Sequence, residues 1–152
     1  MFVKSLTLVT GGFDPIHSGH IEYFKEASKL SQCLVIGLNS DDWLINKKKQ
    51  AFQDWDERCN IIKHLNMVSM VIGWDDSDKT ACGAIEKCLK ISDQVIFANG
   101  GDRLYGNTPE LKAFKKNKRV IFKWGVGGKY KINSSSWLLN NYYKDRAMID
   151  LK

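Results

Sequence analysis

Residues 10–20, TGGFDPIHSGH, constrain this chain more than any other segment, because they follow directly on an apolar run. The segment holds three glycines, one proline and two of the three histidines of the chain. Adjacent glycines after a short apolar run suit a strand that ends in a tight turn. Apolar residues then recur at Ile21, Phe24, Ala27 and Leu30, a spacing that predicts a helix with one buried face.

The same order of elements continues along the chain. Leu34–Leu38 is apolar throughout, as in a strand covered on both faces. Further strands are expected at 3–9, 67–72, 95–98 and 119–124, and helices at 55–65, 80–89, 110–114 and from 134 onwards. Strands alternating with helices predict an α/β fold, namely a Rossmann-like, doubly wound parallel sheet of about five strands in a single domain. Residues 144–152 are polar and mixed, and we expect a C-terminal tail there.

Length and composition exclude several classes of protein. A chain of 152 residues, 43% of them hydrophobic, is sufficient for one buried core. Neither a membrane-spanning run nor an export signal is visible, which favours the cytoplasm and no membrane partner. The four cysteines form no C-x-x-C pair, so no zinc or redox motif is predicted. The net charge of +6 points to an anionic partner.

The glycines and histidines of residues 10–20 together favour a phosphate site. In an open parallel sheet, ligands lie beyond the carboxyl ends of the strands, where amides of the next helix face outward. Gly11 and Gly12 fall at such an end, and Ser18 is placed to cap the helix. His17 and His20 are three residues apart, so both imidazoles are expected on the same side of the first helical turn.

Other interpretations of this segment fit less well. A zinc ion held by the histidine pair needs a third ligand, and only Asp14 lies nearby in sequence. The G-x-G-x-x-G spacing of dinucleotide-binding turns is absent. A purely structural role explains either histidine alone, but not the glycines, Asp14-Pro15 and the histidine pair together. No metal site is predicted.

Residues 10–20 resemble the H-x-G-H signature of the nucleotidyltransferase superfamily. The chain is similar to its cytidylyltransferase-like branch, which includes glycerol-3-phosphate cytidylyltransferase and heptose-phosphate adenylyltransferase, and comparable motifs continue to about residue 139. The resemblance implies a nucleotidyltransferase domain over 1–143 and catalytic roles for His17 and His20. It also implies nucleotide contacts from Thr10, Gly11, Gly12 and Phe13.

Four later motifs supply the remaining expected site residues. The resemblance implies that Lys47 or Lys49, expected on a mobile loop, guards the departing pyrophosphate. The Asn99-Gly100-Gly-Asp102 turn and the serine run Ser134, Ser135, Ser136 are expected to contact the nucleotide. Contacts to phosphates or acceptor are expected from Asp14, Asp41, Arg58 and Lys129. Lys129 stands where the family carries an arginine, and so loses its bidentate fork.

The implied reaction is attack by a phosphate oxygen of a small phosphorylated sugar or polyol on the α-phosphorus of CTP or ATP. Mg²⁺ is expected to accompany the triphosphate. Acceptors of the pantetheine-phosphate or nicotinamide-mononucleotide type remain an alternative, and relatives that form dimers suggest a homodimer.

A non-catalytic nucleic-acid-binding module is the rival of another class. It would use lysines and arginine interleaved with aromatic residues, namely Lys112, Phe114, Lys115, Lys116, Lys118, Arg119, Phe122, Lys123, Trp124, Lys129, Tyr130 and Lys131. Alternate residues of a strand face opposite sides of its sheet, so the aromatic residues are better explained as core, and nucleic acid is disfavoured as a partner.

Overall fold

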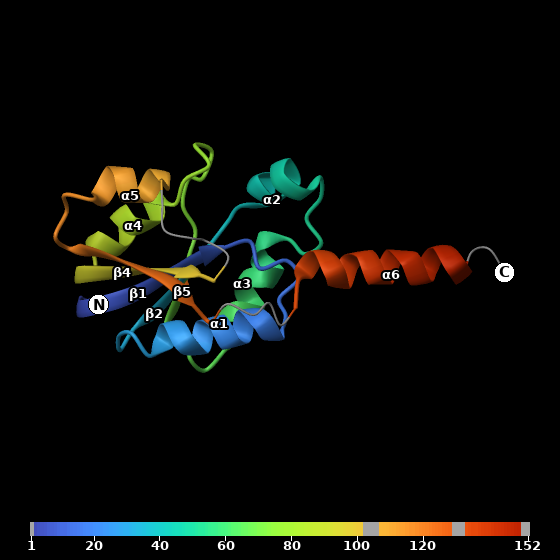
Figure 1. The fold of residues 1–152 in the computed structure, drawn as a ribbon, viewed down its shortest axis with the longest axis horizontal. Coiled ribbons are helices and arrows are strands. Elements are labelled where there is room, and N and C mark those ends of the chain that lie inside the picture. The colour runs from blue at the N-terminus through green and yellow to red at the C-terminus, as the bar shows by residue number, and fades with distance from the viewer. Residues whose placement is uncertain (1, 102–106, 129–132, 150–152) are drawn as a thin grey trace.

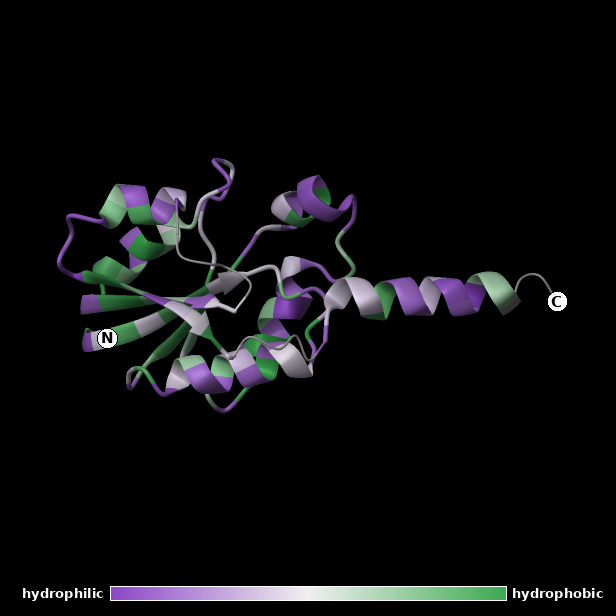
Figure 2. Ribbon diagram, in the orientation of Figure 1, coloured by the Kyte–Doolittle hydropathy of each residue, from purple (hydrophilic) through white to green (hydrophobic). Residues whose placement is uncertain are grey.

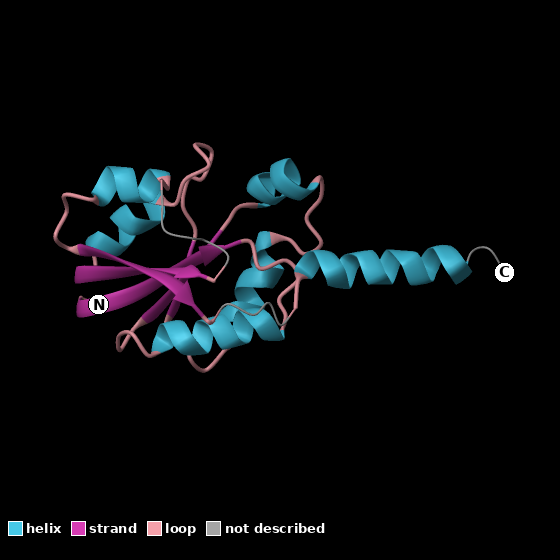
Figure 3. Cartoon of the chain, viewed as in Figure 1, coloured by secondary structure: helices cyan, strands magenta, loops and turns pink. Residues whose placement is uncertain are grey.

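The structure, a computed structural model, describes residues 2–101, 107–128 and 133–149. In these residues a parallel sheet has the strand order β3-β2-β1-β4-β5. The strands are β1 (Val3–Gly11), β2 (Leu34–Leu38), β3 (Met70–Ile72), β4 (Ser92–Gly100) and β5 (Val120–Val126) (Figure 3). The order reverses beside β1, as in the predicted doubly wound sheet, and this places the carboxyl ends of β1 and β4 at the switch point.

Helices cover both faces of the sheet (Figure 1). Helices α1 (Ser18–Ser28) and α3 (Trp55–Lys63) pack on one face, and α4 (Cys82–Leu89) and α5 (Pro109–Phe114) lie on the other. The recurrence at Phe24 and Ala27 predicted the buried side of α1, where both side chains are fully buried. The α/β architecture predicted from the sequence is confirmed.

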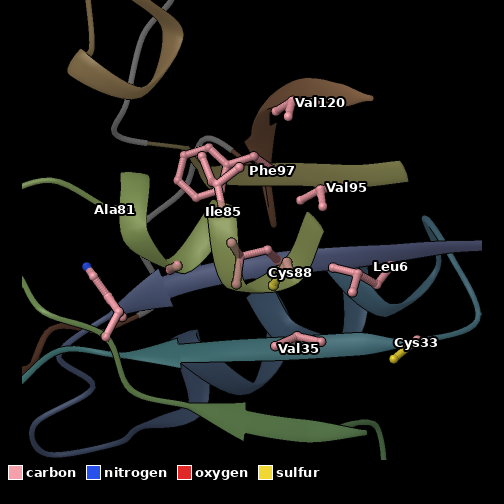
Figure 4. Close-up of a cluster of buried hydrophobic side chains, with 12 residues drawn as sticks. Leu6, Cys33, Val35, Ala81, Ile85, Cys88, Val95, Phe97 and Val120 are labelled. Atoms are coloured by element: carbon pink, nitrogen blue, oxygen red, sulfur yellow. The ribbon is translucent and has the colours of Figure 1, made fainter. Parts of the chain in front are cut away.

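Each face of the sheet has its own apolar cluster. The cluster beneath α4 joins strand residues to the buried side of that helix, including Leu6, Val35, Phe97 and Ile85 (Figure 4). The cluster beneath α1 and α3 contains Val9, Phe13, Phe24, Ile36 and Ile62 among others. In Figure 2 the strands between these layers are predominantly hydrophobic, as expected for a sheet buried on both sides.

A helix that the sequence analysis did not predict, α2 (Asp41–Lys48), follows β2. The expectation that Lys47 and Lys49 lie on a loop is therefore wrong: Lys47 is in the last turn of α2, and Lys49 is its C-cap. The helix buries only Leu44, so no apolar periodicity marks it. Polar residues that favour a helix are present in the sequence: Ser40 caps the first turn, acidic residues stand at the start and lysines at the end.

The last helix, α6 (Ser135–Ile149), projects away from the body of the molecule (Figure 1). It continues past Tyr143, where the sequence suggested that a tail begins, because no residue from 135 to 149 interrupts the helix. The domain division at 143 itself stays a prediction. Large apolar side chains of α6 are exposed, namely Trp137, Leu138, Tyr142, Tyr143 and Met148. Among the described residues, no helix is both long and apolar enough to cross a bilayer.

Candidate active site

The two histidines of residues 10–20 cap helix α1 with their own side chains. His17 is the N-cap, and its Nδ1 accepts a hydrogen bond from the Gly19 amide at 3.1 Å. The amide of His17 in turn donates to Nδ1 of His20 at 3.3 Å. This reciprocal capping box replaces the cap expected from Ser18, because the helix begins at Ser18 rather than after it. Added to Gly19, a Cβ would approach within 3.0 Å of the His17 ring, which explains the glycine between the histidines.

The capping box fixes where each neutral imidazole carries its proton. A ring nitrogen that accepts a hydrogen bond has no proton, so His17 and His20 each leave Nε2–H as a donor. The rings stack with centroids 3.7 Å apart and planes 22° from parallel, and Phe13 packs edge-on against His20. The predicted placement of both rings on the same side of the helix is confirmed.

Burial keeps His20 neutral. Desolvation, the neighbouring His17 and the cation of Lys48 together lower the pKa of His20 to about 3. Lys48 is itself half-buried, and its Nζ donates to the carbonyl of Asp14 at 3.2 Å. Desolvation also lowers the pKa of Lys48, with Arg58 as a smaller cause and Asp14 acting in the opposite direction. His20 is therefore a neutral hydrogen-bond donor, and the positive charge beside it comes from lysine.

A cavity of about 210 Å³ opens beside His20 at the carboxyl ends of β1 and β2. Seven residues expected at the site line it, namely Thr10, Gly11, Gly12, Phe13, His20, Lys47 and Ser135. Its volume falls below the roughly 300–1,000 Å³ of whole-ligand pockets, so it suits phosphate groups better than an entire nucleotide. Donors from backbone, imidazole and ammonium groups make this a site for an anion.

Lysines of α2 differ in their relation to this cavity. Lys47 and Lys48 line it, whereas Lys49 is not among its lining residues. The Lys47 ammonium lies 4.4 Å from the ring centroid of Trp43. Lys49 has a left-handed backbone with φ of 72°, so the chain turns away from the site after Lys48.

Arg58 lies beneath the cavity rather than in it. Its side chain is fully buried. Nη1 donates to the carbonyls of Gly12 at 2.7 Å and Asn39 at 3.0 Å, and Nε donates to the carbonyl of Gln53 at 3.1 Å. Nη2 completes the set with an ion pair to Asp41. A phosphate contact was expected from Arg58. In this structure, each of its three guanidinium nitrogens donates to a protein oxygen instead. Arg58 therefore positions the loops that form the site.

Asp14 and Asp41 extend the same network. The Asp14 carboxylate is buried and accepts hydrogen bonds from the amides of Phe52 at 2.7 Å and Gln53 at 2.8 Å. Asp41 also accepts from the amide of Trp55 at 3.1 Å. Both residues were expected to contact phosphates or acceptor. Here Asp14 ties the segment between α2 and α3 to the opening turn, and Asp41 ties the start of α2 to α3.

The remaining expected residues are divided. Ser135 donates to the carbonyl of Pro15 at 2.8 Å, which joins the start of α6 to the opening turn, while Ser134 is buried and Ser136 exposed. Asn99 is buried at the end of β4, and its side-chain nitrogen has no hydrogen-bond partner among the described residues. Gly100 ends the same strand. Asp102 and Lys129 lie outside the described residues.

Several lining residues were missed by sequence reasoning, namely Asn39, Trp43, Leu44, Lys48, Trp74, Lys79, Thr80, Ala81 and Glu110. Glu110 has a clear structural part, since its carboxyl accepts the amide of Ala81 at 2.7 Å, and Ala81 is the N-cap of α4 without a side-chain cap of its own. Only a contact between distant segments reveals this, so no local signal marks it. Within the described residues, no group of three or more His, Cys, Asp or Glu is arranged to hold a metal ion.

Three residues of the basic aromatic segment that would form a nucleic-acid module are committed to the fold. Phe114 and Phe122 pack against the cluster beneath α4. The guanidinium of Arg119 donates to the carbonyls of Leu89 and Ser92, each at 2.7 Å, and to that of Asp93 at 2.9 Å. These contacts weaken the case for a stacking platform.

Comparison with known proteins identifies relatives of most of the chain. Residues 8–136 match the family model described as cytidylyltransferase-like. The chain is 32% identical over 101 residues to the bifunctional protein HldE of Geobacter metallireducens, covering 65% of this chain and 19% of that protein. It is 28% identical over 125 residues to HldE of Geobacter sulfurreducens, covering 73% and 24%. The chain thus spans about a fifth to a quarter of the length of these relatives.

Solved structures share the fold. The lipopolysaccharide core biosynthesis protein of Thermoplasma volcanium superimposes with a TM-score of 0.65 at 25% identity, covering 84% of this chain and 98% of that chain. A protein of unknown function from Archaeoglobus fulgidus gives a TM-score of 0.53 at 16% identity, covering 86% and 96%, and supports the fold alone.

Replacing Arg58 tests its positioning role. Arg58→Ala leaves buried carbonyls and Asp41 without their donor, so the free energy of unfolding should fall by roughly 3 kcal/mol in urea titrations. Arg58→Lys keeps the positive charge but not the forked guanidinium, so its free energy of unfolding should lie between those of the wild type and Arg58→Ala. The exposed Lys63→Ala on the same helix is the control. An Arg58→Ala protein as stable as the control would contradict the role.

Acid should destabilise the protein through His20. Its native pKa of about 3 lies below the unfolded value of 6.5, so the unfolded chain binds the extra proton and stability falls as the pH drops below 6.5. His20→Gln keeps an acceptor at the capping position but does not titrate. Relative to this variant, the wild type should lose about 2 kcal/mol between pH 6.5 and 5, measured by urea unfolding. Parallel pH profiles would show that His20 is not held neutral.

Proposed function

The chain belongs to the cytidylyltransferase-like family, which makes it a nucleotidyltransferase, and we propose that it transfers CMP or AMP from CTP or ATP to a small phosphorylated sugar or polyol. The stacked pair of imidazoles carries this proposal. His20 lines the anion-binding cavity together with the glycine turn and the lysines of α2, and His17 stacks on His20 at the start of α1. The resemblance of the sequence to the heptose-phosphate adenylyltransferases favours a sugar phosphate as the acceptor and ATP as the donor, while the family name keeps CTP open.

The proposed reaction needs positioning and charge rather than a general base. An acceptor phosphate is already anionic near pH 7, because its second pKa is about 6. One of its oxygens bonds to the α-phosphorus, the bond from that phosphorus to the bridging oxygen breaks, and the electron pair leaves with pyrophosphate. His17 and His20 donate to the oxygens on which charge accumulates, and Lys47 and Lys48 neutralise the departing group.

Magnesium enters this proposal as part of the substrate. The described residues gather no set of three acidic, histidine or cysteine side chains for a permanent ion. We expect Mg²⁺ to arrive coordinated by the triphosphate, the usual arrangement for an ion that keeps several waters.

Pyrophosphate release tests the function. We expect release when the protein is incubated with Mg²⁺, CTP or ATP, and one member of a panel of sugar and polyol phosphates. His17→Ala and His20→Ala should each lower turnover by about two to four powers of ten, since each removes a transition-state donor. His64→Ala, which alters an exposed histidine at the end of α3, is the matched control. Near-normal turnover in both site variants would overturn the assignment, as would salt-sensitive oligonucleotide binding without any pyrophosphate release.

Adjacent lysines give a sharper comparison. Lys48 lines the cavity beside His20, whereas Lys49 turns away from it. Lys48→Ala should therefore reduce turnover at least tenfold more than Lys49→Ala, because it removes a desolvated charge from the reacting phosphates. Steady-state kinetics at saturating triphosphate measure the difference. The opposite order would return the catalytic role to Lys49, which the resemblance implied.

A further inference from the structure

A second and larger cavity adjoins the first. It has a volume of about 740 Å³, within the range of pockets that bind whole small molecules, and lies between α2 and the loop that joins β3 to α4. Four residues line both cavities, namely Trp43, Lys47, Trp74 and Lys79. The two spaces therefore share a wall.

The lining of the second cavity suits a ligand with many hydroxyl groups. Carboxylates of Asp42 and Asp75, the amide of Asn46 and the hydroxyl of Ser77 offer hydrogen-bond acceptors and donors. Asp75 is held ionised, because hydrogen bonds from Ser77 lower its pKa.

Not every acid of this lining is available to a ligand. Asp76 accepts from the side chain of Asn39 at 2.9 Å and from the amide and hydroxyl of Ser40 at 2.9 and 2.6 Å, so its part is structural. Trp43 and Trp74 also line this cavity and add apolar surface for the carbon face of a sugar.

Two lysines stand at the shared wall. Lys47 reaches it from the last turn of α2, with its ammonium over Trp43. Lys79 comes from the opposite side, on the β3–α4 loop, and has a left-handed backbone with φ of 63° that lysine rarely adopts. Its amide donates to the carbonyl of Asp76 at 2.9 Å, which fixes this turn. Because Lys47 and Lys79 bring positive charge to the wall from opposite sides, a phosphate group is most favourable there, between the two cavities.

We propose that the second cavity binds the acceptor as a phosphorylated sugar, with Lys79 and Lys47 holding its phosphate at the shared wall and Asp42 and Asp75 receiving its hydroxyl groups. This inference rests on the proposed function and adds the acceptor subsite to it. A phosphate oxygen held at the wall faces the first cavity, where the α-phosphorus is attacked and pyrophosphate leaves. Binding at this subsite requires the phosphate group of the acceptor. It favours sugar phosphates over acceptors of the pantetheine-phosphate type, which carry fewer hydroxyl groups.

Lys79→Asn tests the subsite without disturbing the turn, because asparagine tolerates the left-handed conformation. The KM for a hexose or heptose phosphate should rise at least tenfold, while the KM for the triphosphate stays within twofold. Lys79→Arg, which restores the charge, should recover the acceptor KM to within threefold of the wild type. Lys90→Asn, at the far end of α4, is the exposed control. A rise in the triphosphate KM instead, or an unchanged acceptor KM, would overturn the subsite.

Direct binding separates the failure of the subsite from that of the reaction. If the wild type releases no pyrophosphate with any triphosphate and phosphate, the proposed function fails. Isothermal titration with a hexose phosphate alone then decides the subsite. Binding that Lys79→Asn weakens tenfold, and that the unphosphorylated hexose does not reproduce, supports it. Binding that is absent, or equal in wild type and variant, contradicts it.

Discussion

The buried guanidinium of Arg58 is the interaction on which the site depends. It joins the carbonyls of Gly12 and Asn39, at the ends of β1 and β2, to the segment between α2 and α3. Asp14 adds two amides of that segment to the opening turn. Carbonyls at strand ends have no partners in the sheet, so a fully buried cation with five donors in a fixed fork satisfies several of them together. The network thereby holds the glycine turn and α2, which carries Lys47 and Lys48, in one arrangement.

Above this network the site separates hydrogen bonding from charge. Stacked imidazoles 3.7 Å apart cannot both be charged at low cost, and burial favours the neutral form of His20. The rings therefore act as oriented donors, and lysines supply the net positive charge. This division suits a reaction in which an anionic nucleophile needs no base and the leaving group carries the negative charge. In the proposed acceptor subsite, the phosphate of the acceptor would lie at the shared wall, opposite those donors.

The sequence predicted the parts of this molecule that local patterns encode. Leu34–Leu38 is uniformly apolar because this strand is buried on both faces of the sheet. The spacing of Phe24 and Ala27 reflects a helix that is buried on one side only. Helix α2 was not predicted because it buries Leu44 alone. Without knowing that residues 41–48 are helical, the sequence could not show which of the lysines at 47–49 faces the site. The burial of Arg58 was not predictable either, since its partners are main-chain carbonyls that any residue supplies. Long-range contacts, such as that between Glu110 and the amide of Ala81, leave no signal near either residue.

Ring-nitrogen NMR of the three histidines tests the central claim most directly, because it reports both tautomer and ligand contact. His17 and His20 should carry their protons on Nε2, whereas His64, whose Nδ1 lies 2.7 Å from the carbonyl of Asn60, should carry it on Nδ1. Adding a nucleoside triphosphate with Mg²⁺ should shift the Nε2 signals of His17 and His20 and leave His64 unchanged. Protons on Nδ1 of the stacked pair, or Nε2 signals that do not respond to triphosphate, would contradict the account.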